Sequence, residues 1–365
     1  FPIDLTQLMA RENNKSVDME GFDKCMAQQK DRSRKATAMS TDDWTMVSDD
    51  ESVDFIGYDA FECDAEIVKY RKIKKGNKEQ YQIVLNRTPF YAESGGQVGD
   101  TGVIEANGKA IRITDTQKEN NLIVHYADAL PDDVNAVFHA RIDIGRRSNI
   151  TKNHSATHLL HAALKQVLGN HVAQKGSLVN ANYLRFDFSH FSKVTDEELR
   201  QVEASVNAQI EAQLQLVEHR NIPIKEALDK GAMALFGEKY GDSVRMIEFG
   251  DSKELCGGIH VKNTADIWHF KIVSEGAVAA GIRRIEAITG DAVKTFYKNQ
   301  ENTLAELKET LKNPQDILKS VATLQDDNAK LKKQIEELAN FKYLRIRENK
   351  CKTREASQSQ ISDLF

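Results

Sequence analysis

The chain has few cysteines and no long apolar run. Its four cysteines lie far apart, unlike the disulfide framework of a small secreted protein. No stretch approaches the roughly 20 consecutive apolar residues that cross a bilayer, so we expect no membrane segment. We therefore expect a cytoplasmic protein in which a cysteine is available to bind a metal, the candidates being Cys25, Cys63, Cys256 and Cys351.

The sequence also lacks an initiator methionine, a signal region and an excess of positive charge. It begins Phe1-Pro2-Ile3, so we interpret it as a fragment of a longer polypeptide. The net charge of -5 argues against a protein coated in positive charge but permits a local basic stripe. A length of 365 residues is enough for two or three domains with separate cores.

Residues 43–145 have the pattern of a β domain. Apolar and polar residues alternate, as in residues 66–70 and 81–85, which predicts strands. Asn107-Gly108 lies between two such segments and predicts a type I′ hairpin, because both central residues must accept positive φ. Several short strands with turn signals predict a small β-barrel, and we interpret the polar, glycine-rich residues 93–97 as a corner of it with a supporting contact.

The flanking segments are predicted mainly from helical periodicity, which makes the whole chain α+β. Residues 1–42 are expected to be the end of a helical domain and a linker, with a helix over residues 18–35. Residues 146–292 are expected to form an α+β domain. Its predicted elements are a helix from about Ser148, a helix over residues 196–217, and strands over residues 183–188, 244–249 and 282–288.

Residues 293–365 are rich in leucine, lysine, glutamate and glutamine, which predicts helices. Asn313-Pro314 is expected to be a cap followed by the first turn of a new helix. Residues four and three apart then form a seam typical of a coiled coil or helical hairpin, through which the chain would self-associate. The seam comprises Ile317, Val321, Leu324, Asn328, Leu331, Ile335 and Leu338.

Two histidines and a cysteine–histidine pair form a candidate metal site. His154 and His158 are four residues apart, which places both imidazoles on one face of a helix. Cys256 and His260 are separated by a turn that two glycines allow to bend tightly. Together these residues supply the ligand types that Zn²⁺ prefers, so we predict one zinc ion per chain. In the alternative, Cys256 is a nucleophile oriented through a histidine by Glu254, which leaves the His154–His158 pair without a role.

Five stretches, in order, resemble the editing domain of alanyl-tRNA synthetases, which free-standing alanyl-tRNA deacylases and, more distantly, threonyl-tRNA synthetase share. In threonyl-tRNA synthetase, a counterpart of residues 88–100 is not expected before the metal domain. The family usually has threonine where this chain has Ile259, and the missing hydroxyl would change the polarity beside the metal motif. The stretches are residues 87–100, 154–161, 176–179 with 185–190, 254–261 and 279–286, and the resemblance covers about residues 1–345.

The resemblance implies a zinc-dependent hydrolase that removes serine or glycine wrongly attached to tRNA(Ala). A pocket for a methyl group rejects glycine and serine poorly, since binding alone discriminates by only about 10- to 200-fold, so a second, hydrolytic site is required. The parent synthetase attaches alanine to tRNA(Ala) with ATP and Mg²⁺. This chain has no nucleotide-binding signature, so both are expected only in the absent aminoacylation domain.

The resemblance also implies roles for further residues. Cys256 is expected to act in catalysis, because a displaceable thiolate would open a zinc position, whereas four firm protein ligands would close the site. Gln174 resembles a pocket residue of the family that would bond the serine hydroxyl or position water; equally, it is an exposed strand residue. The candidate contacts to tRNA phosphates, or alternatively parts of solvated faces, are Arg146, Arg147, Arg283 and Arg284.

Two other functions stay open at this stage. One is a non-catalytic tRNA-binding module in which zinc is purely structural. The other is a free-standing alanyl-tRNA deacylase, against which the helices over residues 1–35 and 304–341 argue.

Overall fold

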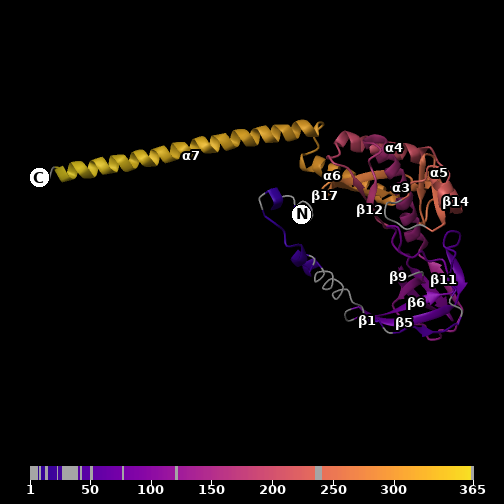
Figure 1. Ribbon diagram of the computed structural model, residues 1–365. Helices are drawn as coiled ribbons and strands as arrows, with labels where there is room; N and C mark the ends of the chain where they lie inside the picture. The colour runs from indigo at the N-terminus through magenta and orange to yellow at the C-terminus, as the bar shows by residue number, and fades with distance from the viewer. Residues whose placement is uncertain are drawn as a thin grey trace. The chain divides into compact units, whose positions relative to one another are not determined.

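The computed structural model describes residues 7, 10–12, 15–22, 24–26, 40–41, 43–49, 52–75, 78–119, 122–234 and 241–362. It divides into two compact units, Phe1–Val293 and Lys294–Phe365 (Figure 1). The boundaries at residues 42 and 145 within the first unit stay predictions. In the predicted helix over residues 18–35, residues 19–22 and 24–26 are helical, and the rest beyond residue 26 lies outside the described residues.

The N-terminal part of the first unit is built from β structure, as the alternating pattern predicts. Asn107 and Gly108 have φ angles of 53° and 72°, which confirms the hairpin turn between β8 and β9. The strands are β1 (Ser40–Thr41), β2 (Thr45–Met46), β3 (Asp54–Phe55), β4 (Glu62–Ala65), β5 (Ile67–Lys75), β6 (Lys78–Leu85), β7 (Arg87–Thr88), β8 (Gly102–Ala106), β9 (Lys109–Glu119), β10 (Leu122–Ala127) and β11 (Phe138–Ile142).

The main sheet is open in the described residues, so the predicted small barrel is not confirmed. Nine strands of that part of the chain pair in the order β1-β5-β6-β10-β9-β8-β11-β4, with β2 also on β5, and no described pairing joins β1 to β4. Alternation predicts which residues face the core, but closure requires pairing between edge strands distant in sequence. The core of this part includes Ile67, Ile83, Leu85, Ile104, Ile113, Phe138 and Ile142 from the sheet and Phe90 from the segment between β7 and β8.

The second part of this unit packs two helices on a four-stranded sheet of order β12-β13-β18-β17. Helix α4 begins with a capping box between Thr195 and Glu198. The predicted helices are present as α3 and α4, although α4 ends at Glu211 instead of residue 217, and the strands now labelled β13, β15 and β18 are confirmed. The elements are α3 (Ile144–Leu168), β12 (Gln174–Val179), β13 (Leu184–Ser189), α4 (Asp196–Glu211), β14 (Val217–Pro223), α5 (Ile224–Asp229), β15 (Ser243–Phe249), β16 (Ser252–Leu255), the 3-10 helix η1 (Thr264–Ile267), β17 (Phe270–Ala279) and β18 (Ile282–Thr289).

The strands β14, β15 and β16 form a separate antiparallel sheet, whose strand β16 contacts α3. Strand β16 ends at Leu255, directly before Cys256. One face of α3 and α4 and the strands of both sheets share one core. It includes Leu159, Leu160, Leu164, Phe186, Phe188, Val202, Val206, Phe249, Phe270 and Ile285.

The second unit consists of most of α6 (Gly290–Thr310) and of α7 (Ile317–Ser362). Lys312 and Asn313 have positive φ, which ends the first helix, and the Asp316 carboxylate accepts a hydrogen bond from the Lys319 amide at 2.9 Å. The cap of α7 is therefore Asp316 rather than the predicted Asn313.

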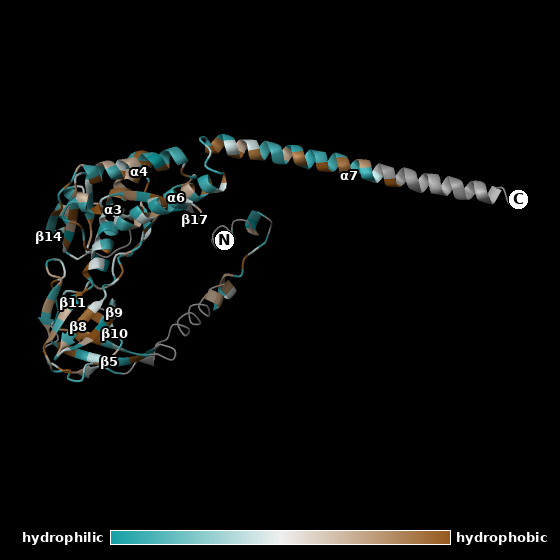
Figure 2. Cartoon of the chain, turned by 180° about the vertical axis from the view of Figure 1, so that it is seen from behind, coloured by the Kyte–Doolittle hydropathy of each residue, from teal (hydrophilic) through white to brown (hydrophobic). Residues whose placement is uncertain are grey.

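Helix α7 is continuous, so the predicted hairpin does not form within residues 317–362. Its apolar residues recur among polar ones (Figure 2). The seam is exposed from Leu324 onward, and no partner helix for that part is present among the described residues, so a coiled coil stays a prediction. None of the described helices combines the length and the apolar character that crossing a bilayer requires.

Candidate metal centre

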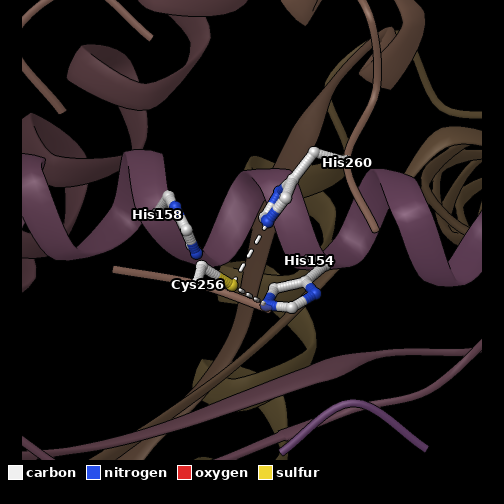
Figure 3. A group of neighbouring side chains, drawn as sticks. All are labelled: His154, His158, Cys256 and His260. Carbon is white, nitrogen blue, oxygen red and sulfur yellow. Dashed lines mark hydrogen bonds between the residues drawn. The ribbon is translucent and has the colours of Figure 1, made fainter. Parts of the chain in front are cut away.

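Helix α3 brings two of the four predicted ligands together. His154 and His158 lie one turn apart on it, and both side chains are buried. The other two follow β16, where Cys256 and His260 flank a short turn. Figure 3 shows the four side chains converging on one point. Their possible ligand atoms all lie within 4.8 Å of one another.

Contacts within the group are centred on the thiol. The Cys256 Sγ lies 3.5 Å from Nε2 of His154 and 3.3 Å from Nε2 of His260. Burial, reinforced by the neighbouring imidazoles, holds the pKa of His154 and of His260 well below the ordinary value. Burial also lowers the pKa of His158. The imidazoles are therefore neutral near pH 7, which is the form that binds a metal.

Two of the three histidines are oriented by hydrogen bonds on the nitrogen remote from the thiol. His154 Nδ1 lies 2.7 Å from the Gln97 Oε1, and His260 Nδ1 lies 3.2 Å from the Ser155 Oγ. Because an amide oxygen only accepts, His154 carries its proton on Nδ1 and turns the lone pair of Nε2 toward the thiol. This pattern is typical of metal-bound histidine.

The third histidine, His158, has different surroundings. Nδ1 of His158 is buried and, within the described part of the chain, has no hydrogen-bond partner. Its Nε2 lies 3.6 Å from a carboxylate oxygen of Glu254. A thiol, two oriented imidazoles and a third buried imidazole beside a carboxylate form a donor set that fits Zn²⁺.

Two side chains hold the turn that presents Cys256 through three hydrogen bonds. Arg245 Nη1 donates to the carbonyls of Cys256 and Gly258 at 2.8 and 2.6 Å, and the Tyr58 hydroxyl donates to the Gly257 carbonyl at 2.7 Å. The Arg245 guanidinium also lies over the Tyr58 ring, 4.2 Å from its centroid. Tyr58 belongs to the N-terminal β part, so both halves of the first unit hold this turn.

The alternative arrangement with a cysteine nucleophile is less well supported. Glu254, its expected orienting group, accepts a hydrogen bond from Nδ1 of His161 at 2.9 Å and lies beside His158. It is not bonded to His260 or His154, the histidines next to the thiol. The sequence did not indicate that Ser155 and Gln97 contact His260 and His154, or that Arg245 holds the turn after Cys256. Of these contacts, the one signal was that Gln97 lies in the predicted glycine-rich turn.

Two family models match parts of the chain. The model described as tRNA synthetases class II (A) matches residues 1–145. The model described as threonyl and alanyl tRNA synthetase second additional domain matches residues 244–286, which contain Cys256 and His260.

Comparison of the whole chain favours the alanyl over the threonyl synthetases that the second model covers. The chain is 65% identical, over 94% of its length, to the alanine–tRNA ligase of Flavobacterium psychrophilum. It is similar to alanine–tRNA ligase. The ligases of Christiangramia forsetii and Porphyromonas gingivalis are 56% and 48% identical over 94% and 96% of the chain. The chain spans about 40% of the length of each of these alanine–tRNA ligases.

Gln174 and Ile259 were expected to matter from the resemblance to alanyl-tRNA synthetases. Gln174 begins β12, and its amide donates to the Ser177 hydroxyl at 3.3 Å; no contact with the four ligand residues is recorded in the described structure. Ile259 donates its backbone N–H to the Gln97 Oε1 at 2.9 Å. Any residue except proline supplies that N–H, so isoleucine in place of the threonine usual in alanyl-tRNA synthetases leaves this contact unchanged.

The four arginines proposed as phosphate contacts differ in exposure. Arg147 is only 2% exposed and bonds Asp100 and the carbonyls of Gly57 and Pro89, so the structure does not favour it as a phosphate contact. The other three are partly buried and bonded to groups of the protein. Arg146 donates to the Gly99 carbonyl, Arg283 pairs with Glu275, and Arg284 pairs with Asp187 through two bonds.

Proposed function

We propose that this chain is the editing segment of an alanine–tRNA ligase, which hydrolyses Ser-tRNA(Ala) and Gly-tRNA(Ala) at a zinc site. The observation that carries the proposal is the convergence of His154, His158, Cys256 and His260 in a chain so similar to alanine–tRNA ligases. The match to the second additional domain of threonyl and alanyl tRNA synthetases supports it. The relatives named above are all ligases, which favours this reading over a free-standing deacylase.

The ligand residues have distinct roles in this proposal. His154, His158, Cys256 and His260 would hold Zn²⁺, which when bound would supply a Lewis acid for the ester carbonyl that joins the amino acid to the terminal ribose. The three histidines are buried, whereas Cys256 is partly exposed. The thiolate is therefore the ligand at which solvent or substrate gains access, so we place the exchangeable position there.

The remaining proposed residues would bind the aminoacyl-tRNA substrate. Gln174 has a long hydrogen bond to Ser177, which a serine hydroxyl or a water molecule would replace. Arg146, Arg283 and Arg284 would contribute to the attraction of tRNA phosphates despite their acidic or carbonyl partners. Such attraction weakens with salt, so hydrolysis of the whole tRNA substrate should fall as ionic strength rises.

One observation favours a second candidate, a tRNA-binding module with structural zinc. Four protein ligands complete a tetrahedral set, which is the pattern of structural zinc sites. In that case the chain would bind zinc and tRNA(Ala) but would not hydrolyse the ester.

Hydrolysis by the purified, zinc-loaded chain separates the two candidates. We expect Ser-tRNA(Ala), and Gly-tRNA(Ala), to be cleaved much faster than Ala-tRNA(Ala), and metal analysis to give one zinc per chain. Cys256→Ala should remove most of this activity, whereas Cys63→Ala, at a partly buried cysteine in the β part, should not. A folded, zinc-loaded chain that cleaves none of these substrates would establish the structural alternative.

The same substrates test whether Gln174 recognises the hydroxyl of serine. Gln174→Val should slow cleavage of Ser-tRNA(Ala) more than that of Gly-tRNA(Ala), because only serine offers a hydroxyl to the lost amide. Equal slowing of both would assign Gln174 to water positioning or to structure. Unchanged rates for both would remove it from the site.

A further inference from the structure

Gln97 connects the N-terminal β part to both halves of the metal-ligand set. Its side chain is 0% exposed. The single oxygen Oε1 lies 2.7 Å from Nδ1 of His154 on α3 and 2.9 Å from the backbone nitrogen of Ile259, in the turn between Cys256 and His260. One acceptor atom therefore holds together two segments that are about a hundred residues apart in the chain.

The backbone around Gln97 is itself fixed. Gln97 and Ser94 exchange hydrogen bonds of 3.0 and 3.1 Å across a tight turn, and the next residue, Val98, donates to the Val179 carbonyl of β12 at 3.1 Å. Gly96 has a φ of 84°, and an added Cβ would meet the Ser177 hydroxyl at 2.2 Å. The glycine-rich turn is thus needed to bring this one side chain against β12 and the metal centre.

The contacts determine which end of the amide faces the site. A backbone N–H is always a donor, so the Gln97 atom opposite Ile259 must be the oxygen. The same oxygen then accepts from His154, whose proton is placed on Nδ1. The Gln97 Nε2 is buried and has no hydrogen-bond partner among the described residues. The contacts made by Gln97 at this site therefore depend on its acceptor alone.

We propose that Gln97 is a positioning residue of the metal centre, whose amide oxygen holds His154 in its metal-binding tautomer and aligns the turn carrying Cys256 and His260. This rests on the proposed metal site but not on its hydrolytic activity. Partners of this kind raise metal affinity by about 10- to 100-fold, because they fix the orientation of the ligand before the metal binds.

Zinc affinity of the whole chain tests this role. It is measured by competition with a chromophoric chelator, with Co²⁺ absorption spectra as a report on ligand geometry. Gln97→Met removes the acceptor at similar volume and should weaken zinc binding about 10- to 100-fold and alter the Co²⁺ spectrum. Gln97→Glu keeps an acceptor for both donors and should restore wild-type affinity and spectrum.

A matched control distinguishes positioning from general loss of structure. Gln82, also buried in the β part, accepts a hydrogen bond from Arg71, so Gln82→Met removes a comparable contact away from the metal. It should leave zinc affinity unchanged, and the metal-free Gln97 variants should keep the wild-type circular dichroism spectrum. Wild-type zinc affinity in Gln97→Met would overturn the proposal, as would an equal loss in folded Gln97→Glu.

These results are independent of the proposed hydrolysis. A wild-type chain that binds zinc without cleaving Ser-tRNA(Ala) refutes the editing function and leaves the role of Gln97 standing. A Gln97→Met chain with wild-type zinc affinity refutes the role of Gln97 and leaves editing standing.

Discussion

Gly257 and Gly258 are adjacent, yet the structure gives them different constraints. A Cβ added to Gly257 meets nothing within 4 Å, whereas a Cβ added to Gly258 lies 2.0 Å from Cε1 of His154 and 2.8 Å from the Gln97 Oε1. Only the second glycine permits the close approach of the turn to α3. The requirement at Gly258 is therefore one of space around a metal ligand.

Alanine substitutions at these positions should have opposite outcomes. Gly258→Ala must push His154 away and should lower zinc affinity about tenfold or more, because the ligand loses its position. Gly257→Ala should bind zinc as the wild type does. Chelator competition measures both, and equal affinities for the two variants would contradict this account of the turn.

The surroundings of His125 in β10 determine its tautomer and its pKa. It is fully buried, with Nδ1 3.0 Å from the Ile83 carbonyl and Nε2 2.8 Å from the Thr88 hydroxyl. A carbonyl only accepts, so Nδ1 carries the proton and Nε2 accepts from the hydroxyl. Burial lowers the pKa of His125 from 6.5 to about 4.

This shift predicts a loss of stability in acid. The unfolded chain takes up a proton near pH 6.5 and the folded chain only near pH 4, so the free energy of unfolding falls as the pH drops between these values. The loss amounts to about 3 kcal/mol and is complete below pH 4. Urea unfolding of wild type and His125→Gln across this range measures it, and the variant should lose less stability on acidification. Parallel pH profiles would contradict the shift.

At the scale of elements, α3 is the helix that joins the two parts of the first unit. It begins two residues after β11 ends, with the Asp143 carboxylate accepting from the Arg146 amide. In its first turn, Arg147 forms a buried ion pair with Asp100 and donates to two backbone carbonyls of the β part. These contacts hold the N-terminal end of the helix whose next turns carry the histidines.

Breaking this ion pair should be costly. Arg147→Met leaves the Asp100 carboxylate buried without its cation and should reduce the free energy of unfolding by about 3–5 kcal/mol. Arg200→Met, at an exposed pair with Glu197, should cost less than about 1 kcal/mol. Adding Asp100→Asn to Arg147→Met should recover part of the loss. Chemical denaturation measures all three, and a loss at Arg147 no larger than at Arg200 would refute this role.

The end of helix α4 is a boundary that the sequence periodicity predicts incorrectly. The helix was predicted to run to residue 217 but ends at Glu211, and Gln213 has a φ of 53°. Leu214 and Leu216 pack on the core two residues apart, and β14 starts at Val217. The apolar residues fit both periods, and the strand forms because it pairs with β15.

At the scale of the whole molecule, the second unit contains none of the four candidate ligand residues. All four ligands lie in the first unit, and Val293 is the last buried apolar residue of α6. The seam of α7 is exposed from Leu324 onward, at 57% for Leu324 and Leu331 and 69% for Leu338. We therefore propose that this unit is a spacer or self-association element.

Truncation after residue 300 tests this division of roles. The shortened chain keeps the buried first turn of α6, so zinc binding and hydrolysis of a minimal acylated substrate should match those of the whole chain. Sedimentation should show any self-association of the whole chain to be lost. A folded truncated protein that binds zinc but fails to hydrolyse the minimal substrate would show that the second unit contributes to the reaction.

The sequence by itself determined the two local pairs of candidate ligands, His154 with His158 and Cys256 with His260, most strands and helices, and the hairpin at Asn107-Gly108. These features depend on local relations: residues four apart share a helix face, alternation marks a strand, and a Cys–Gly–Gly turn is tight by composition. They are therefore readable from short stretches of the chain.

Only the tertiary structure decided the contacts between distant segments. It left the main sheet open in the described residues, buried Arg147 against Asp100, directed Glu254 toward His161, and placed Gln97 on His154. Each depends on how separate elements pack, because hydrogen bonds and ion pairs between distant residues form only where the fold brings donor and acceptor within about 3 Å. No periodicity within a single stretch encodes such a meeting.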